Sequence, residues 1–284
     1  MKIGLVVEGG GMKCAYTAGI LDKFLDYNIT FDYAIGVSAG SSCTASFLAG
    51  QRDRNRRFFV EHVGEPGYMG VRTFLKTGSF FGLEYIYATL TNSDGADPVD
   101  YQMILDNPAE FKIVATDAVT GKPVYFDKTD AKQDDYRIFM ASCAIPVVTK
   151  PVKLDGKLYF DGGCSDPIPV RKALSDGCDK VVILLCRPKD TVRTPEKHRE
   201  ILKTALLKYP KTFHAVENRA IVYNEVLSFS RQLEEEKKAF IIAPNEALPV
   251  STYTRDPEVL QNLYEIALKE FEEKKDKLSA FLKG

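Results

Sequence analysis

Apolar positions along the first 50 residues follow two alternating patterns, one typical of strands and one typical of helices. Residues 2–7 form a β-rich apolar run, and residues 15–25 carry apolar side chains at helical spacing. The order then repeats, because residues 33–37 predict a second strand and the small residues of 39–48 predict a closely packed helix. Two adjacent strand-to-helix crossovers favour a parallel sheet covered by helices, since parallel neighbours need a crossover connection.

Residues 51–108 have a different pattern. The segment opens with an arginine cluster at 52–57, continues through glycine- and aromatic-rich sequence, and ends in the polar stretch 92–98. We interpret it as an insertion over the sheet. Its aromatic residues are Tyr68, Phe74, Phe80, Phe81, Tyr85 and Tyr87.

The pattern after the insertion predicts two hairpins. One covers residues 111–127, and the other covers 151–160 around Asp155-Gly156, which is a strong two-residue turn signal. A helix is expected between them, over 134–144. The second hairpin leads directly into an Asp-Gly-Gly sequence.

The carboxy-terminal part is dominated by helical patterns. Residues 181–185 predict a central strand, a short strand follows around 240–242, and 257–282 form an amphipathic, lysine-rich helix with one solvated side. The whole pattern predicts an α/β fold of three layers, α/β/α, with a mostly parallel central sheet.

Composition limits the classes of partner. A chain of 284 residues, 45% of them hydrophobic, is long enough to bury a substantial core. The formal net charge of −1 provides no global field that would attract nucleic acid or an anionic membrane. We therefore expect no nucleic-acid partner, and any peripheral membrane contact must be local.

The cysteines and the lengths of the apolar runs indicate where in the cell the protein is expected. Six cysteines are scattered without a CxxC pair or a Cys/His cluster, which indicates reduced thiols and no metal site. No apolar run approaches the roughly 20 residues of a transmembrane helix, and the run at 1–7 is too short for a signal peptide. We expect a soluble, cytoplasmic protein, with peripheral association at a membrane left open.

The first candidate for catalysis is the serine of a GxSxG sequence. Ser38 directly follows the predicted strand at 33–37 and precedes the small-residue helix. This motif places a serine on a sharp strand-to-helix turn, where flanking glycines leave its hydroxyl exposed. We assign Gly36, Ala39 and Gly40 to this nucleophile elbow. The alternative is a glycine-rich turn whose serine caps the helix.

A second glycine-rich turn precedes it. Gly9, Gly10, Gly11 and Met12 follow the first strand and lead into a helix, so their backbone N–H groups can converge on an anion. In an acyl hydrolase this anion is the tetrahedral oxyanion. A nucleotide-phosphate cradle fits less well, because Cys14 stands where the dinucleotide fingerprint requires its last glycine.

The three histidines are weak candidates for the base that activates Ser38. His62 lies in the arginine-rich insertion, and His198 and His214 lie in lysine-rich helical sequence. His198 and His214 follow both Ser38 and Asp161, so the chain order of a Ser-acid-His triad does not exclude them. Their surroundings indicate surface positions without an orienting partner.

Asp161 is the better candidate. It ends a predicted strand, and Gly162 and Gly163 would let the backbone turn tightly and bring the carboxylate beside the serine. Burial would raise its pKa toward a useful value for a general base. The alternative is a turn aspartate at the end of a hairpin.

Together these motifs resemble those of the patatin-like phospholipases. The glycine loop at 9–13, the GxSxG at 36–40 and the Asp-Gly-Gly at 161–163 occur in that family's order, and 141–146 resembles its Ala-Ser-x-Ala-x-Pro segment. The loop departs from the family's Gly-Gly-Gly-x-Arg-Gly at Lys13 and Cys14. The lysine keeps the charge but loses the planar fork of arginine.

The resemblance implies a patatin-like fold, with a catalytic core over 1–190 that includes the insertion at 51–108, and a helical extension over 191–284 packed on the same domain. It implies hydrolysis of a carboxylic ester in an acyl lipid by a Ser38–Asp161 dyad, with the glycine loop as oxyanion hole and with no metal or organic cofactor. The aromatic side chains of the insertion would line a channel for the acyl chain or form a lid over it. The alternative is that they pack in the core of an ordinary helical subdomain.

Other functions stay open at this point. A short-chain esterase, thioesterase or acyltransferase could use the same dyad, and a non-catalytic acyl-lipid-binding protein could keep the fold. The arginines at 52–57 would meet lipid phosphate or form solvated surface. The sequence does not predict the oligomeric state.

Overall fold

The fold is built around one mixed sheet, described by a computed structural model for residues 1–195, 198–247 and 249–284. The strand order is β5-β6-β3-β2-β1-β7-β8, and β4 pairs with β3 beside this path. The strands are β1 (Ile3–Val7), β2 (Tyr33–Val37), β3 (Glu110–Asp117), β4 (Pro123–Asp127), β5 (Val152–Leu154), β6 (Lys157–Asp161), β7 (Lys180–Leu184) and β8 (Ala239–Ile242).

The centre of the sheet is parallel and its outer part is antiparallel. Strands β3, β2, β1, β7 and β8 run parallel, whereas β4 and β6 pair with β3 in the antiparallel direction and β5 pairs with β6 in the same way. Every residue of β2 is buried, as expected for a strand covered on both faces. Both predicted hairpins, β3–β4 and β5–β6, are confirmed.

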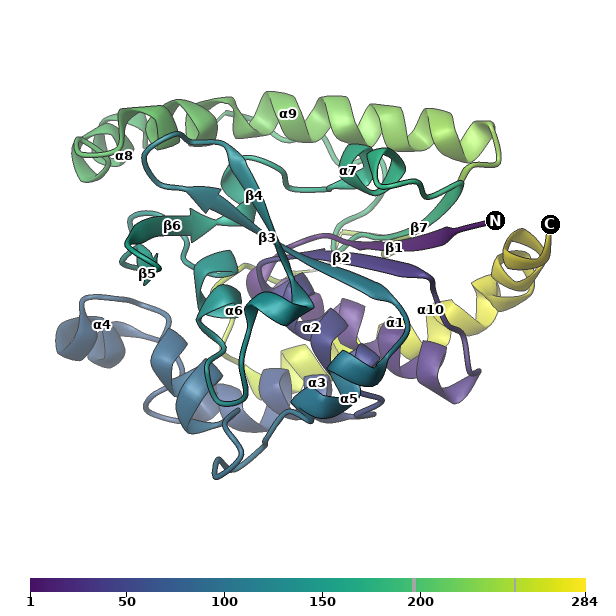
Figure 1. The fold of residues 1–284 in the computed structure, drawn as a ribbon, viewed down its shortest axis with the longest axis horizontal. Coiled ribbons are helices and arrows are strands. Elements are labelled where there is room, and N and C mark those ends of the chain that lie inside the picture. Colours follow the sequence, from purple (N-terminus) through teal and green to yellow (C-terminus); the bar gives the residue numbers. More distant parts are fainter. Residues whose placement is uncertain (196–197, 248) are drawn as a thin grey trace.

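Helices cover both faces of the sheet (Figure 1). On one face lie α7 (Val170–Ser175), α8 (Arg199–Ala205) and the long α9 (Pro210–Glu235). The other face is covered by α1 (Cys14–Asp26), α2 (Ala39–Leu48), α3 (Arg54–Arg56), α4 (Val71–Thr77), α5 (Tyr101–Asp106), α6 (Arg137–Ser142) and α10 (Pro257–Lys283). The predicted three-layer α/β/α architecture with a mostly parallel sheet is confirmed.

The carboxy-terminal part contributes to both the sheet and a helical layer. Strand β8 pairs with β7 in parallel, and α10 packs along α1. The helices approach closely at Gly19, where an added Cβ would come within 2.7 Å of Ala267. Two buried hydrogen bonds join the same helices, from Tyr16 to Glu270 and from Tyr264 to Asp22, each 2.8 Å long.

The insertion consists of short helical segments on the α1 and α2 side of the sheet (Figure 1). Besides α3, α4 and α5 it contains two π-helical segments, Arg57–Glu61 and Tyr85–Thr89. Buried side chains from the insertion, from α1 and α2 and from α10 form one continuous apolar core. A second core lies on the opposite face of the sheet, beneath α7 and α9.

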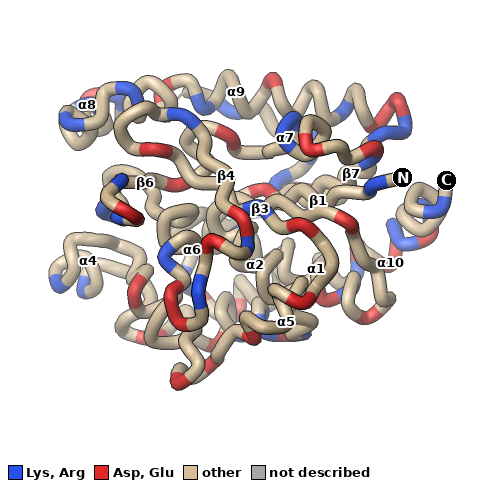
Figure 2. Tube along the Cα trace, in the orientation of Figure 1, with Lys and Arg blue, Asp and Glu red and all other residues tan. Residues whose placement is uncertain are grey.

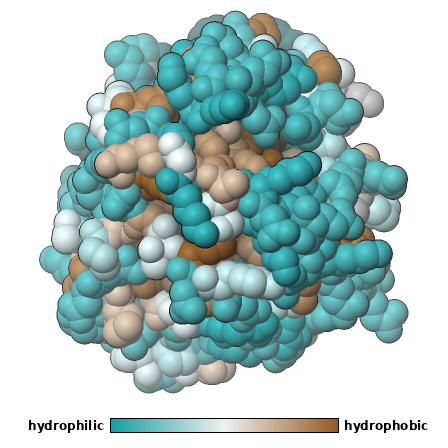
Figure 3. All heavy atoms as spheres, turned by 90° about the vertical axis from the view of Figure 1, so that its right-hand side faces the viewer, coloured by the Kyte–Doolittle hydropathy of each residue, from teal (hydrophilic) through white to brown (hydrophobic). Residues whose placement is uncertain are grey.

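The surface carries both signs of charge throughout. Figure 2 shows basic and acidic residues interspersed along most elements, including α9 and α10, in keeping with the net charge of −1. The face at which both termini lie is mostly hydrophilic, with small apolar areas between polar side chains (Figure 3). Among the described residues, no helix combines the length and apolar character needed to cross a membrane.

Candidate active site

The register of the sheet brings three distant motifs to one place. Val7 of β1 pairs with Gly36 of β2, so the loops that follow these two parallel strands lie side by side. On the other side of β2, Val37 pairs with Val114 of β3. The next residue of β3 pairs with Asp161, so the serine after β2 and the aspartate at the end of β6 are separated by one strand.

Ser38 occupies a sharp turn between β2 and α2. Its φ of 54° and ψ of −135° are unusual for a residue with a side chain, which indicates a strained turn held by its surroundings. Gly40 is needed there, because an added Cβ would collide with the carbonyl oxygen of Glu8. Gly36 is the penultimate residue of β2, and Ala39 begins α2. The side chain of Ser38 is buried but lines a pocket.

Ser142, which the sequence analysis did not single out, holds this turn. The backbone N–H of Ser38 donates to its Oγ at 2.8 Å, and this hydroxyl donates to the carbonyl oxygen of Val114 at 2.6 Å. The Oγ of Ser41 adds a bond of 2.7 Å to the Ser38 carbonyl. A single serine at the end of a helix does not predict that its side chain supports a distant turn. The sequence signal for Ser142 was its place in the segment 141–146.

Asp161 lies at the end of β6 with its carboxylate beside Ser38. The backbone N–H of Gly163 donates to Oδ1 of Asp161 at 2.7 Å. The backbone N–H of Asp161 donates to the carbonyl oxygen of Ala144 at 2.8 Å. Burial raises the pKa of Asp161 to about 6, while the interaction with the Ser38 side chain and the Gly163 N–H act in the opposite direction. Gly162 opens the short 3₁₀ turn that follows.

The glycine loop lies against the serine. At Gly9 an added Cβ would come within 2.9 Å of the Cβ of Ser38, so only glycine lets the loop approach this closely. Gly9, Gly10, Gly11, Ser38 and Asp161 line one pocket. Their arrangement lets the loop amides and the hydroxyl act on one reacting carbonyl.

The last two loop positions have other partners. The N–H of Met12 donates to the carbonyl oxygen of Thr252 at 3.4 Å, so this amide is directed away from a role at the serine. The ammonium group of Lys13 donates to the carbonyl oxygen of Val250. Cys14 is fully buried beside Glu8 and fills the space that a glycine would leave.

The histidines lie elsewhere. All three are described by the structure, and none of them lines a pocket that contains Ser38. His62 contacts Glu65 at 2.7 Å, and His214 is an exposed residue on α9 that pairs with Glu217 at 3.5 Å. His198 precedes α8.

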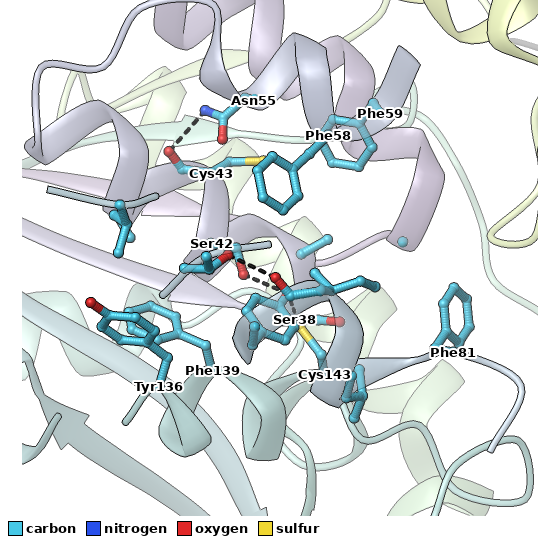
Figure 4. A pocket seen from close by; sticks show the side chains of 18 of the residues that line it. Ser38, Ser42, Cys43, Asn55, Phe58, Phe59, Phe81, Tyr136, Phe139 and Cys143 are labelled. Carbon is cyan, nitrogen blue, oxygen red and sulfur yellow. Dashed lines mark hydrogen bonds between the residues drawn. The ribbon is translucent and has the colours of Figure 1, made fainter. Parts of the chain in front are cut away.

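An apolar pocket extends from Ser38 into the insertion. It contains about 890 Å³ of unfilled space, its open mouth included, and its lining is mostly apolar and aromatic. Figure 4 shows the rings of Phe58, Phe81 and Phe139 around the space next to Ser38. Of the aromatic residues expected in the insertion, Tyr68, Phe81 and Tyr87 line this pocket, whereas Phe74 is exposed.

The arginine cluster at 52–57 is held by internal ion pairs. Arg52 pairs with Asp26 at 2.6 Å, Arg57 pairs with Asp97 at 2.6 Å, and Arg54 is buried against Ser46, Thr91 and Asp97. Arg54 is thus used inside the molecule and Arg57 is held by the buried Asp97, whereas Arg52 is exposed and forms its ion pair at the surface.

A second, polar pocket meets the apolar one at Ser38, with Asp161 and three arginines in its wall. The arginines are Arg187, Arg193 and Arg219, which the sequence analysis did not identify because they lie in no motif. In residues 1–195, 198–247 and 249–284 there is no group of three or more His, Cys, Asp and Glu side chains that could hold a metal ion.

Comparison with known proteins agrees with this geometry. The family model described as patatin-like phospholipase matches residues 5–174, and a domain of unknown function, DUF6363, matches residues 209–283. An uncharacterized protein of Escherichia coli, YjjU, is 29% identical over 197 residues, which are 69% of this chain and 55% of that protein. The chain thus spans about half the length of this relative.

Two further comparisons are more distant. An uncharacterized NTE family protein of Mycobacterium bovis is 42% identical over 65 residues, covering 22% of this chain and 16% of that protein. The crystal structure of VipD from Legionella pneumophila matches with a TM-score of 0.50 at 15% identity, over 97% of this chain and 67% of that chain. At this identity the likeness concerns the fold alone.

Proposed function

The chain belongs to the patatin-like phospholipase family, and on this premise we propose that it hydrolyses carboxylic esters of acyl lipids with Ser38 as nucleophile and Asp161 as base. The observation that carries the proposal is that Ser38 lies where the apolar pocket meets the glycine loop, with Asp161 beside it in the polar pocket. The family supports a lipid acyl hydrolase, and the residues and the substrate are our assignment.

In the first step Ser38 Oγ attacks the acyl carbonyl while Asp161 accepts the hydroxyl proton. A carboxylate whose pKa is about 6 is deprotonated at neutral pH and is a stronger base than an ordinary aspartate. The backbone amides of the glycine loop stabilise the oxyanion, and one such donor is worth about 10²–10³ in rate. Asp161 then returns the proton to the leaving alcohol.

In the second step water hydrolyses the acyl-enzyme. Asp161 takes a proton from the water, the hydroxide adds to the acyl carbon, and the proton returns to Ser38 as the fatty acid leaves. The strained backbone of Ser38 keeps the ester close to both the carboxylate and the loop in each step. Met12 contributes less than Gly10 and Gly11, because its amide is directed to Thr252.

The apolar pocket favours a substrate with a long acyl chain over a substrate with an acetyl group. Its wall is formed by apolar and aromatic side chains from α2, the insertion and α6, which favour a hydrocarbon chain over water. Burial of each methylene contributes about 0.8 kcal/mol, so affinity should rise along a chain-length series.

The test is a series of nitrophenyl esters from acetate to palmitate with the purified protein. We expect kcat/KM to increase with chain length and to be lost in Ser38→Ala. Ser175→Ala removes an exposed hydroxyl that donates to the Lys172 carbonyl oxygen at 2.8 Å, and it serves as the matched control. Activity on the acetate that disappears for long chains would contradict the lipid assignment.

A further inference from the structure

Several polar side chains in the wall of the apolar pocket are bonded within the protein. One helical turn after Ser38, the hydroxyls of Ser42 and Tyr87 bond each other at 2.7 Å. Deeper in the insertion, the guanidinium group of Arg54 donates to the hydroxyl of Thr91 at 3.1 Å. These polar groups are satisfied without a ligand.

Two other polar side chains of the same wall have oxygens without such partners. Tyr68 and Asn55 both line the pocket and are only 4% and 6% exposed. The amide nitrogen of Asn55 donates to the carbonyl oxygen of Cys43 at 3.1 Å (Figure 4). Among the residues that the structure describes, no hydrogen bond involves Oδ1 of Asn55 or the hydroxyl of Tyr68.

Both oxygens open onto the pocket. In the described part of the chain, the unpaired side-chain atoms that are closed off from any free space belong to Thr17, Asn92 and Tyr223. The oxygens of Tyr68 and Asn55 are not among them, so they keep contact with the space in the pocket. An unpaired polar atom in a buried wall is costly, and a ligand group that bonds it removes this cost.

The two groups lie part of the way along the pocket from the serine. Helix α2 forms one wall, and Cys43, which bonds the Asn55 amide, follows Ser38 by a rise of about 7.5 Å along the helix. Burial raises the pKa of Tyr68, and the neighbouring Cys43 and Cys143 act in the same direction, so its hydroxyl lies near α2 and the end of α6. An acyl chain that starts at Ser38 would therefore pass these oxygens with its middle part.

We propose that Tyr68 and Asn55 form a subsite for a hydroxyl group on the acyl chain, so that the site prefers esters of hydroxylated fatty acids. The proposal rests on the proposed function, because it takes the apolar pocket as the acyl side. A hydroxyl both donates and accepts a hydrogen bond, and the wall offers an acceptor in Asn55 Oδ1 and a donor in the Tyr68 hydroxyl. The surrounding hydrocarbon excludes water, which strengthens the discrimination that such bonds provide.

The test compares nitrophenyl palmitate with its 6-hydroxy, 9-hydroxy and 12-hydroxy derivatives, each diluted in the same neutral detergent micelles. Because the two oxygens lie at a fixed depth, we expect one isomer to be hydrolysed with a kcat/KM about threefold to tenfold above that of palmitate. The other isomers place their hydroxyl against hydrocarbon, so their kcat/KM should fall about tenfold below that of palmitate.

Variants of the two residues separate a subsite from a structural role. Tyr68→Phe keeps the ring and removes the hydroxyl, so the ratio of kcat/KM for the preferred hydroxy ester to that for palmitate should fall about tenfold. On palmitate alone kcat/KM should rise, because the wall then presents only hydrocarbon at this position. Asn55→Leu removes the acceptor and should lower the same ratio. A purely structural role would instead lower the activity on both esters together.

Tyr101→Phe is the matched control, because it removes another buried hydroxyl of the insertion, one that donates to the Lys128 carbonyl oxygen at 2.8 Å and lies outside the pocket lining. Thermal melting of each variant shows that it is folded. Three hydroxy isomers that are all poorer substrates than palmitate would overturn the subsite. So would a ratio that Tyr68→Phe leaves unchanged or that Tyr101→Phe lowers as much. Failure of the wild type on palmitate and on all three derivatives would instead reject the proposed function.

Discussion

The two pockets at Ser38 come from different parts of the chain. Apart from the shared Ile145, the apolar pocket is built from residues 11–143, chiefly α2, the insertion and α6. The polar pocket takes its three arginines, Arg187, Arg193 and Arg219, from the segment after β7 and from α9. The lining of the apolar pocket is mostly apolar and aromatic, although it includes Arg54 and Asn55.

Under the proposed function, the insertion would determine which acyl chain the site accepts, and the polar pocket would receive the alcohol part of the ester. Ser38 lines both pockets, and Asp161 lies beside it in the polar pocket. Changes at the dyad should therefore affect all substrates, and changes in one wall should alter only one kind of selectivity.

The largest effect is expected at the proposed base. Asp161→Asn should lower kcat/KM by about 10³-fold on every ester, since the amide cannot accept the serine proton. Asp166→Asn is the matched control, because this partly buried aspartate accepts a hydrogen bond of 2.8 Å from the Tyr125 hydroxyl and burial likewise raises its pKa to about 6. Steady-state kinetics with equal losses in both variants would contradict the assignment of Asp161.

A smaller effect is expected on the acyl side alone. Ala45 lines the apolar pocket, so Ala45→Leu should fill part of the space used by a long chain. We expect the palmitate-to-butyrate ratio of kcat/KM to fall roughly tenfold. Ala280→Leu, at an exposed position of α10, should leave this ratio as it is. An unchanged ratio in Ala45→Leu would show that the acyl chain binds elsewhere.

The ionisation of Asp161 should appear in the pH dependence. The base is active when deprotonated, and burial raises its pKa to about 6, so kcat/KM should be level above pH 7 and fall about tenfold per unit below pH 6. A pH series in which Asp166→Asn keeps this profile would assign the midpoint to Asp161. A midpoint near pH 4, or one that moves in the Asp166 variant, would contradict it.

The smallest effect is expected at the histidines. His198→Ala and His214→Ala should change kcat/KM by less than about twofold, since exposed side chains outside both pockets have no path to the serine. A large loss in either variant, with an unchanged melting temperature, would favour a triad over the dyad.

Local patterns predicted the parts of the site that are contiguous in sequence. The strand, turn and helix around Ser38 and the hairpin that ends at Asp161 follow from apolar periodicity and turn residues, and the sheet confirms these elements. The support from Ser142 and the arginines of the polar pocket could not be predicted, because they depend on strand register and on where α9 packs. The ion pairs of Arg54 and Arg57 could not be predicted either, since their shared partner Asp97 is distant in sequence.

The central claim is that Ser38 is an activated nucleophile, and labelling with a serine-directed fluorophosphonate tests it most directly. The reagent is added to the folded wild type and to Asp161→Asn, and the adduct is located by peptide mass spectrometry. We predict one adduct, on Ser38, that forms much more slowly in the variant. A stable protein that gains no adduct, or gains it on another serine, would contradict the account.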